Sequence, residues 1–297
     1  MSGDATDLGL RQEPRRFGGG RLAFFGGLQR VSAALGGRAF YRAAFLAPGR
    51  FRVRHETVIT PGLAPELEAF RIVQLSDPHA GPFLGRGDLS AVVEACNALD
   101  PDLVVLTGDL ITKRAEESYL LLEDLAGLRA RRGSFGVFGN HDYRGRRERE
   151  IAARFEAEAG LRFLLDESVR FGEGPGAVAL VGLEDLEEAK QVDLQRARHA
   201  VRAGDVEVVL CHNPAGGPAL AAAGCALVLS GHSHGHQIDL PLVRRLAPAH
   251  PGDRVERDGA VLLTSRGLGA LGVPLRLRSP AEIVVVDLSR GGGERAR

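Results

Sequence analysis

The stretch Arg71-Ile72-Val73-Gln74-Leu75-Ser76-Asp77-Pro78-His79 decides the fold, because a short apolar run ends directly in two residue types that bind metals. The run from Arg71 to Leu75 is typical of a buried strand. Asp77 and His79 follow it with one residue between them, so if the strand continues, both side chains face the same side and can hold one cation. The sequence therefore predicts a strand that delivers metal ligands at its carboxyl end.

Four more apolar runs end in the same way. They are expected strands at 103–106, 136–138, 206–210 and 226–229, and each precedes candidate ligands or catalytic groups. These candidates are Asp109, Asn140, His141, Asp142, His212, His232 and His234. Ligands of open α/β sheets bind beyond the carboxyl ends of the strands, so residues far apart in sequence can converge there. Carboxylate, amide and imidazole donors together suit divalent Mn, Fe, Co, Ni or Zn.

Alternating strand and helix patterns predict an α/β fold with parallel strand pairs. Helical patterns are expected at 87–98, 116–130, 146–159, 193–203 and 215–223. Additional strands are expected at 51–59, 162–170, 177–183, 260–264 and 282–288. This number of strands is too large for one open sheet, which favours two packed sheets flanked by helices.

The ordered motifs resemble those of a known family, the calcineurin-like metallophosphoesterases, over residues 70–240. The matching segments are Asp77-Pro78-His79, Gly108-Asp109, Gly139-Asn140-His141-Asp142, His212 and Gly231-His232-Ser233-His234. The segments 71–77, 230–234 and 265–269 resemble the branch of small bacterial phosphodiesterases that includes UDP-2,3-diacylglucosamine hydrolases. The resemblance implies a four-layer αββα sandwich at 51–297. It also implies hydrolysis of a phosphodiester or pyrophosphate bond through in-line attack by a metal-bound hydroxide.

The resemblance also implies a role for each site residue. One metal would be held by Asp77, His79 and His234, the other by Asn140, His212 and His232, with Asp109 bridging the two. His141 would stabilise developing charge or protonate the leaving oxygen, and Asp142 would hold its tautomer; the alternative for Asp142 is a helix cap.

Two further residues are candidates for substrate contact. His236 stands where the branch commonly has Gly, and it either touches substrate or is neutral variation. Arg266 follows an expected strand and either binds a substrate phosphate or forms a surface salt bridge. Pro78, where the branch commonly has Leu, alters the local turn and removes no ligand.

Two alternatives to a phosphodiesterase or pyrophosphatase are considered. A protein Ser/Thr phosphatase is disfavoured because the motifs match the small bacterial branch. A non-catalytic metal-binding scaffold is disfavoured because all seven ligand positions carry competent donors.

The first 50 residues form a basic arm ahead of an acidic body. Residues 1–54 contain ten arginines and three acidic residues, a net charge of +7 in a chain whose total is zero. Phe24, Leu28, Val31 and Leu35 recur at helical spacing, which suits a peripheral helix on an anionic membrane; a loose tail or an ordinary packed helix is the alternative. No nucleic-acid-binding motif is present. Three cysteines without metal-site spacing indicate a reducing compartment, so we expect a cytoplasmic protein, with the inner membrane face as the site of any peripheral binding.

Overall fold

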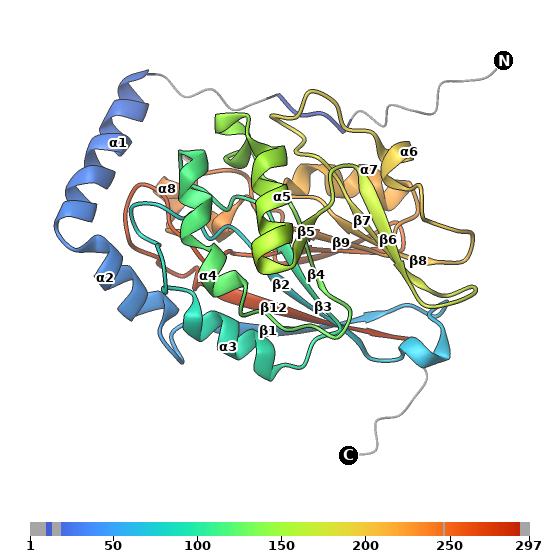
Figure 1. Ribbon diagram of the computed structural model, residues 1–297. Helices are drawn as coiled ribbons and strands as arrows, with labels where there is room; N and C mark the ends of the chain where they lie inside the picture. The colour runs from blue at the N-terminus through green and yellow to red at the C-terminus, as the bar shows by residue number, and fades with distance from the viewer. Residues whose placement is uncertain (1–9, 14–18, 246, 292–297) are drawn as a thin grey trace.

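The computed structural model describes residues 10–13, 19–245 and 247–291, and its centre is a pair of packed six-stranded sheets (Figure 1). The first sheet has the order β1 (Arg52–Ile59), β12 (Glu282–Ser289), β2 (Phe70–Leu75), β3 (Leu103–Thr107), β4 (Ser134–Val137) and β5 (Leu161–Phe163). The second has the order β10 (Arg254–Arg257), β11 (Ala260–Thr264), β9 (Leu227–Ser230), β8 (Val206–Leu210), β7 (Val178–Gly182) and β6 (Glu167–Phe171). Neighbouring strands are mostly parallel, so the carboxyl ends of β2, β3, β4, β8 and β9 are available to one site.

The described helices are short and flank the sheets. They are α1 (Gly19–Ala34), α2 (Gly37–Tyr41), α3 (Ser90–Ala98), α4 (Leu122–Leu125), α5 (Glu148–Ala159), α6 (Leu194–Ala197), α7 (Gly217–Ala222) and α8 (Pro241–Arg244). In Figure 1, α3, α4 and α5 cover the first sheet, while α6 and α7 lie on the side of the second.

The layers are held together by three separate apolar cores. Successive side chains of one strand enter different cores, because they point to opposite faces of the sheet. On the first sheet, Val73 and Val104 belong to the core beneath α3 and α5, whereas Ile72 and Val105 belong to the core between the sheets. On the second sheet, Val208 joins the inner core, and its neighbour in sequence, Val209, packs with α6 and α7. Successive side chains of one strand face opposite sides, so almost every strand residue here is apolar. The expected four-layer α/β architecture is confirmed.

Some local predictions were wrong. The run at 162–170 is two strands, because the chain turns at Asp166, where φ is 54°, and crosses from β5 of the first sheet to β6 of the second. The expected helix at 116–130 consists of a 3-10 helix (Ala115–Leu120) followed by α4. β10 was not predicted, because it is an edge strand with exposed side chains and no apolar alternation.

The segment before β1 contains both exposed and packed parts. Tyr41 and Leu46 are buried in the core beneath the first sheet, and the Tyr41 hydroxyl donates to the Leu268 carbonyl at 2.6 Å. Leu10 is buried in the core beneath the second sheet. By contrast, most side chains described for α1 are exposed or half-buried. Across the described ranges, no helix has the length and apolar character needed to cross a membrane.

Candidate metal centre

Backbone hydrogen bonds hold the site loops of the first sheet together. The Asp77 amide donates to the Gly108 carbonyl and the His79 amide to the Asp109 carbonyl, both at 3.0 Å. Asp77, His79 and Asp109 all have φ between 48° and 52°, a left-handed conformation that costs energy in non-glycine residues. Asp77 and His79 therefore converge through two turns and not, as expected from the sequence, through a continuing strand.

Close approach of the loops requires glycine. A Cβ on Gly108, whose φ is 86°, would lie 2.6 Å from both His212 Nδ1 and the Gly139 amide nitrogen. The two loops and the His212 ring occupy the space that a side chain would need.

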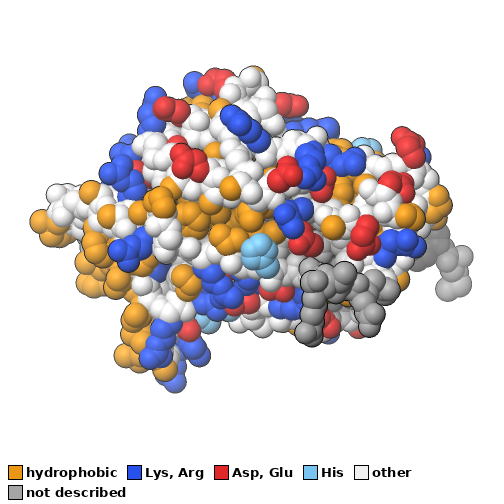
Figure 2. Space-filling model, turned by 90° about the horizontal axis from the view of Figure 1, so that it is seen from below, with side chains coloured by type: hydrophobic (Ala, Val, Ile, Leu, Met, Phe, Trp, Pro, Cys, Tyr) orange, Lys and Arg blue, Asp and Glu red, His pale blue; other side chains and the backbone are white. Residues whose placement is uncertain are grey.

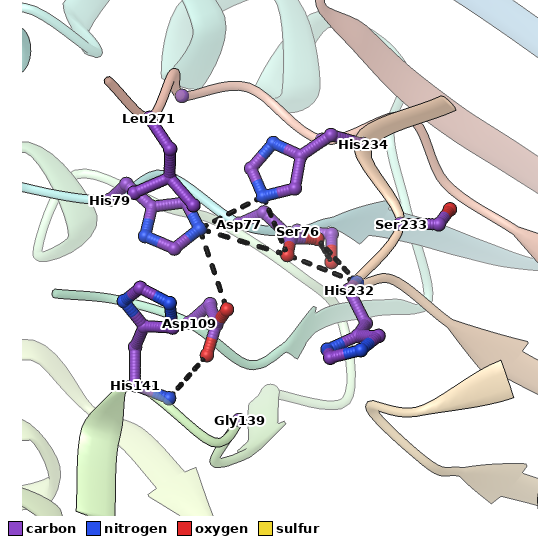
Figure 3. Close-up of polar contacts among 12 residues, drawn as sticks. Ser76, Asp77, His79, Asp109, Gly139, His141, His232, Ser233, His234 and Leu271 are labelled. Atoms are coloured by element: carbon purple, nitrogen blue, oxygen red, sulfur yellow. Dashed lines mark hydrogen bonds and ion pairs between the residues drawn. The ribbon is translucent and has the colours of Figure 1, made fainter. Parts of the chain in front are cut away.

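The first group of donors consists of Asp77, His79, Asp109 and His234 (Figure 3). His79 Nε2 lies 2.9 Å from His234 Nε2 and 3.4 Å from Asp109 Oδ2, and His234 Nε2 lies 3.4 Å from Asp77 Oδ1. The Nδ1 of His79 is 3.0 Å from the Ile111 carbonyl, to which only a protonated Nδ1 can donate, so in the neutral ring Nε2 carries a lone pair. Donors about 2.0–2.2 Å from one cation lie about 3.0–3.5 Å apart, so this spacing fits a metal.

The second group consists of Asp109, His212 and His232, with Asn140 beside it. His212 Nε2 lies 3.4 Å from Asp109 Oδ1 and 3.3 Å from His232 Nδ1, which is 3.2 Å from Asn140 Oδ1. His212 Nδ1 lies 2.7 Å from the Thr107 carbonyl. This contact orients the His212 ring in the same way that the Ile111 carbonyl orients the ring of His79. The two oxygens of Asp109 thus face different donor groups, as expected of a bridging carboxylate.

Burial and charge determine which of these groups are ionised. Burial raises the pKa of Asp77 to about 7 and holds the pKa values of His79 and His234 well below their usual range. Burial opposes charge on Asp109 and His212 as well, but their mutual attraction prevails, lowering the pKa of Asp109 and raising that of His212. Neutral imidazoles are the metal-binding form, and a nearby dication favours ionised Asp77. The donor set therefore fits divalent cations.

His141 and Asp142 lie beside the two groups but are not bonded to each other in the expected way. The His141 amide donates to Asp109 Oδ1 at 2.8 Å, and its ring Nδ1 is 2.8 Å from the Thr112 carbonyl. The buried Asp142 carboxylate instead accepts from the Ile111 and Gly139 amides. The tautomer of His141 is thus held by a backbone carbonyl, and Asp142 holds two site loops together.

The contacts of His236 and Arg266 involve residues outside the two donor groups. Arg266 donates to both oxygens of Asp253 at 2.8–2.9 Å and to the Arg278 carbonyl, which matches the salt-bridge alternative. His236 Nδ1 lies 3.4 Å from Asp239. Neither residue belongs to the donor groups, and their substrate contacts stay predictions.

Glu187 is a site residue that the sequence reasoning missed. Its Oε1 lies 3.6 Å from His232 Nε2, on the side of the ring away from His212, and accepts from Asn213 Nδ2 at 2.9 Å. The buried Asp185 accepts from the Glu187 amide and so shapes this loop. Burial raises the pKa of Glu187 to about 7 and that of Asp185 to about 6. The available signal was an acidic cluster just past the end of an expected strand, the same arrangement that located the other site residues.

Comparison with known proteins assigns the family. The family model for calcineurin-like phosphoesterases matches residues 70–236, more than half of the chain. The chain is 32% identical over 245 residues to a Bos taurus protein named "Transmembrane protein with metallophosphoesterase domain", covering 76% of this chain and 54% of that protein. It is 27% identical over 276 residues to an uncharacterized metallophosphoesterase of Aquifex aeolicus, covering 88% of this chain and 99% of that protein. The chain belongs to the calcineurin-like phosphoesterase family.

Two of the relatives are longer than this chain, and the similar solved structure matches only part of it. The chain spans about half the length of the two vertebrate relatives, the cattle protein and one from Danio rerio. Among solved structures, NAD nucleotidase of Haemophilus influenzae is similar at 17% identity with a TM-score of 0.45, over 68% of this chain and 46% of that one. The family assignment rests on the sequence matches.

Proposed function

We propose that the chain is a dinuclear metal-dependent phosphoesterase that hydrolyses a phosphodiester or pyrophosphate bond. The observation that carries the proposal is the arrangement of Asp109, whose two oxygens each lie 3.4 Å from a histidine of a different donor group. When bound, two divalent cations would polarise the phosphate and lower the pKa of an attacking water. The chain's own residues would place the phosphate between the two groups for in-line attack.

His141 is proposed to act on the leaving oxygen through Nε2, because its other ring nitrogen faces the Thr112 carbonyl. Burial lowers the pKa of His141 to about 4, so in the free protein the ring is neutral near pH 7, with its proton on Nδ1 and a lone pair on Nε2. To protonate the leaving oxygen, Nε2 must first take up a proton, which the negative charge of a bound phosphate favours. Asn140 lies next to it in sequence and faces the second donor group. The proposed acid and a proposed metal ligand therefore stand on one loop.

The test of this activity is hydrolysis of bis-p-nitrophenyl phosphate after reconstitution with Mn²⁺. Asp109→Asn is expected to abolish turnover and lower the metal content, because the amide lacks the charge that both donor groups share. Circular dichroism should show an unchanged fold. A variant with two metals per chain and full turnover would refute the bridging role. Lack of turnover by the reconstituted wild type would favour the metal-binding scaffold.

We further propose that the substrate is lipid-linked, with UDP-2,3-diacylglucosamine as an example, and that α1 binds the inner membrane surface. Phe24, Val31 and Leu35 on and just after α1 are 66%, 58% and 82% exposed. Figure 2 shows hydrophobic side chains gathered with basic ones at the end of the molecule where α1 lies in Figure 1. Each basic residue near an anionic membrane contributes about 1 kcal/mol, and apolar insertion adds to that.

Contacts in the fold support a link between this surface and the metal centre. A Cβ on Gly272 would touch the Phe25 ring at 3.4 Å, so α1 borders the loop at 265–279. The Gly269 amide of the same loop donates to the Asp77 carbonyl at 2.8 Å. A lipid held along α1 would therefore lie close to the site.

Membrane binding can be measured by co-sedimentation with vesicles that contain anionic lipid. The triple variant Phe24→Ser, Val31→Ser, Leu35→Ser should lose salt-sensitive binding, while Ile59→Ser, at an equally exposed apolar position on β1, should keep it. Substitution is preferable to removing residues 1–50, because Tyr41 and Leu46 belong to the core. Equal sedimentation of all three proteins would contradict membrane docking and leave the metal site unaffected.

A further inference from the structure

Arg144 lies beside the metal centre and is held there by two contacts that do not neutralise its charge. Its Nη1 donates to the Thr112 carbonyl at 2.8 Å, and its Nη2 lies 3.0 Å from His141 Nε2. A guanidinium has five N–H donors, so three remain for a ligand. The side chain is exposed, which keeps these donors accessible from solvent.

The charge of Arg144 is uncompensated. Most described arginines near acidic residues form ion pairs, such as Arg147 with Glu116 and Glu150 on the neighbouring helix. Within the described ranges, Arg144 forms no ion pair, and neither do Lys113 and Arg146 on the same two loops. These three exposed residues of the two loops are called the basic rim (Lys113, Arg144, Arg146), and Arg144 contacts the His141 ring beside the donor groups.

The charge of the metal centre itself indicates what the rim is for. Two dications bound by the carboxylates of Asp77 and Asp109 would leave a net charge of +2, or +1 with the attacking hydroxide counted, which balances the single negative charge of a phosphodiester. The basic rim adds positive charge beyond what one phosphodiester group requires. A second phosphate group would satisfy it, because a guanidinium binds phosphate oxygens through two parallel N–H bonds.

We propose that Arg144 binds a second phosphate group of the substrate, so that the site prefers a pyrophosphate ester over a simple phosphodiester. This inference rests on the proposed hydrolase function and deepens it by naming the substrate class. Arg144 keeps its Nη1 bond to Thr112 and turns its remaining donors to the phosphate that is not attacked. Lys113 and Arg146 add attraction for the same group without a fixed geometry.

The first measurement is binding, which does not depend on turnover. The metal-loaded wild type and Arg144→Gln are titrated with adenosine diphosphate, with Mn²⁺ in fixed excess, and separately with inorganic phosphate. Loss of hydrogen bonds to a charged group should weaken adenosine diphosphate binding roughly 10- to 100-fold, with little change for inorganic phosphate. Arg144→Lys keeps the positive charge but cannot bind two phosphate oxygens through parallel N–H groups. Its affinity for adenosine diphosphate should therefore lie between the affinities of the wild type and Arg144→Gln. Arg149→Gln, exposed on α5, is the matched control and should bind as the wild type.

The second measurement compares substrates. Arg144→Gln should lower kcat/KM for a nucleotide sugar, which carries a pyrophosphate, far more than for bis-p-nitrophenyl phosphate. Equal losses for the two substrates, or a lower kcat with unchanged adenosine diphosphate affinity, would overturn the proposal and leave Arg144 as a positioning residue for His141. Should the wild type hydrolyse neither substrate, the proposed function fails, while the titrations still decide whether Arg144 binds a second phosphate.

Discussion

Replacing Glu187 with glutamine should weaken one metal site and spare the other. His232 Nδ1 lies 3.2–3.3 Å from His212 Nε2 and Asn140 Oδ1, so Nδ1 is the atom that would bind a metal in this group. The ring proton would then be on Nε2, which lies 3.6 Å from Glu187 Oε1. A carboxylate behind a histidine ligand fixes the ring and raises its basicity. Glutamine has nearly the same shape and can still accept from Asn213, so the change removes mainly the charge.

The expected magnitude follows from this distance. Loss of such an outer carboxylate commonly lowers metal affinity about 10- to 100-fold. The 3.6 Å separation is too long for a hydrogen bond, so the lower end applies, about tenfold or about 1.4 kcal/mol. Only the group that contains His212 and His232 should be affected, because Glu187 has no described contact with His79 or His234.

Calorimetric titration of the metal-free protein with Mn²⁺ resolves the two sites. Glu187→Gln should shift the affinity of one site and leave the other unchanged. Glu188→Gln, the neighbouring half-buried carboxylate, is the control and should match the wild type. The reasoning is refuted if both sites weaken equally, or if Glu188→Gln has the same effect as Glu187→Gln.

Three further predictions concern catalysis, pH and backbone geometry. His141→Asn should keep both metals, measured by elemental analysis, and lose about 10²-fold or more in turnover with poor leaving groups but less with p-nitrophenolate; a missing metal would make His141 a ligand. Asp77 and Glu187 have pKa values raised to about 7, so the folded metal-free protein binds more protons than the unfolded chain. The contribution of these two carboxyl groups to stability is therefore complete below about pH 4 and is lost as pH rises through about 7, so the Tm of the metal-free protein should fall between pH 6 and pH 8, and Mn²⁺ should raise Tm more at pH 8 than at pH 6; a metal-free Tm that increases over this interval contradicts the assignment. Gly108→Ala should destabilise the fold by about 1–3 kcal/mol in denaturant titrations and reduce metal content, because its Cβ collides with His212; unchanged values would show that the loop adapts.

The local sequence was sufficient to predict the layers and most of the donors. Apolar runs such as 103–106 have the length and the β-branched content typical of a buried strand, and such a strand places the residues that follow it at the carboxyl edge of the sheet. The order of Asp77, Asp109, Asn140, His212 and His234 along the chain therefore indicated one site before any contact was known. The same local information failed at 162–170, where one strand was expected to run through Asp166 although the chain changes sheets there.

By itself, the sequence determined which residue types stand at the strand ends and the charge separation between arm and body. Tertiary structure alone decided which partner each side chain meets. Asp142 binds two backbone amides instead of His141, Arg266 is held by Asp253, and Glu187 lies behind His232 although 45 positions separate the last two. The physical reason is that residue type and spacing determine only which residues lie at the end of one strand. Hydrogen bonds between loops depend also on the turns that follow each strand and on how the two sheets pack against each other.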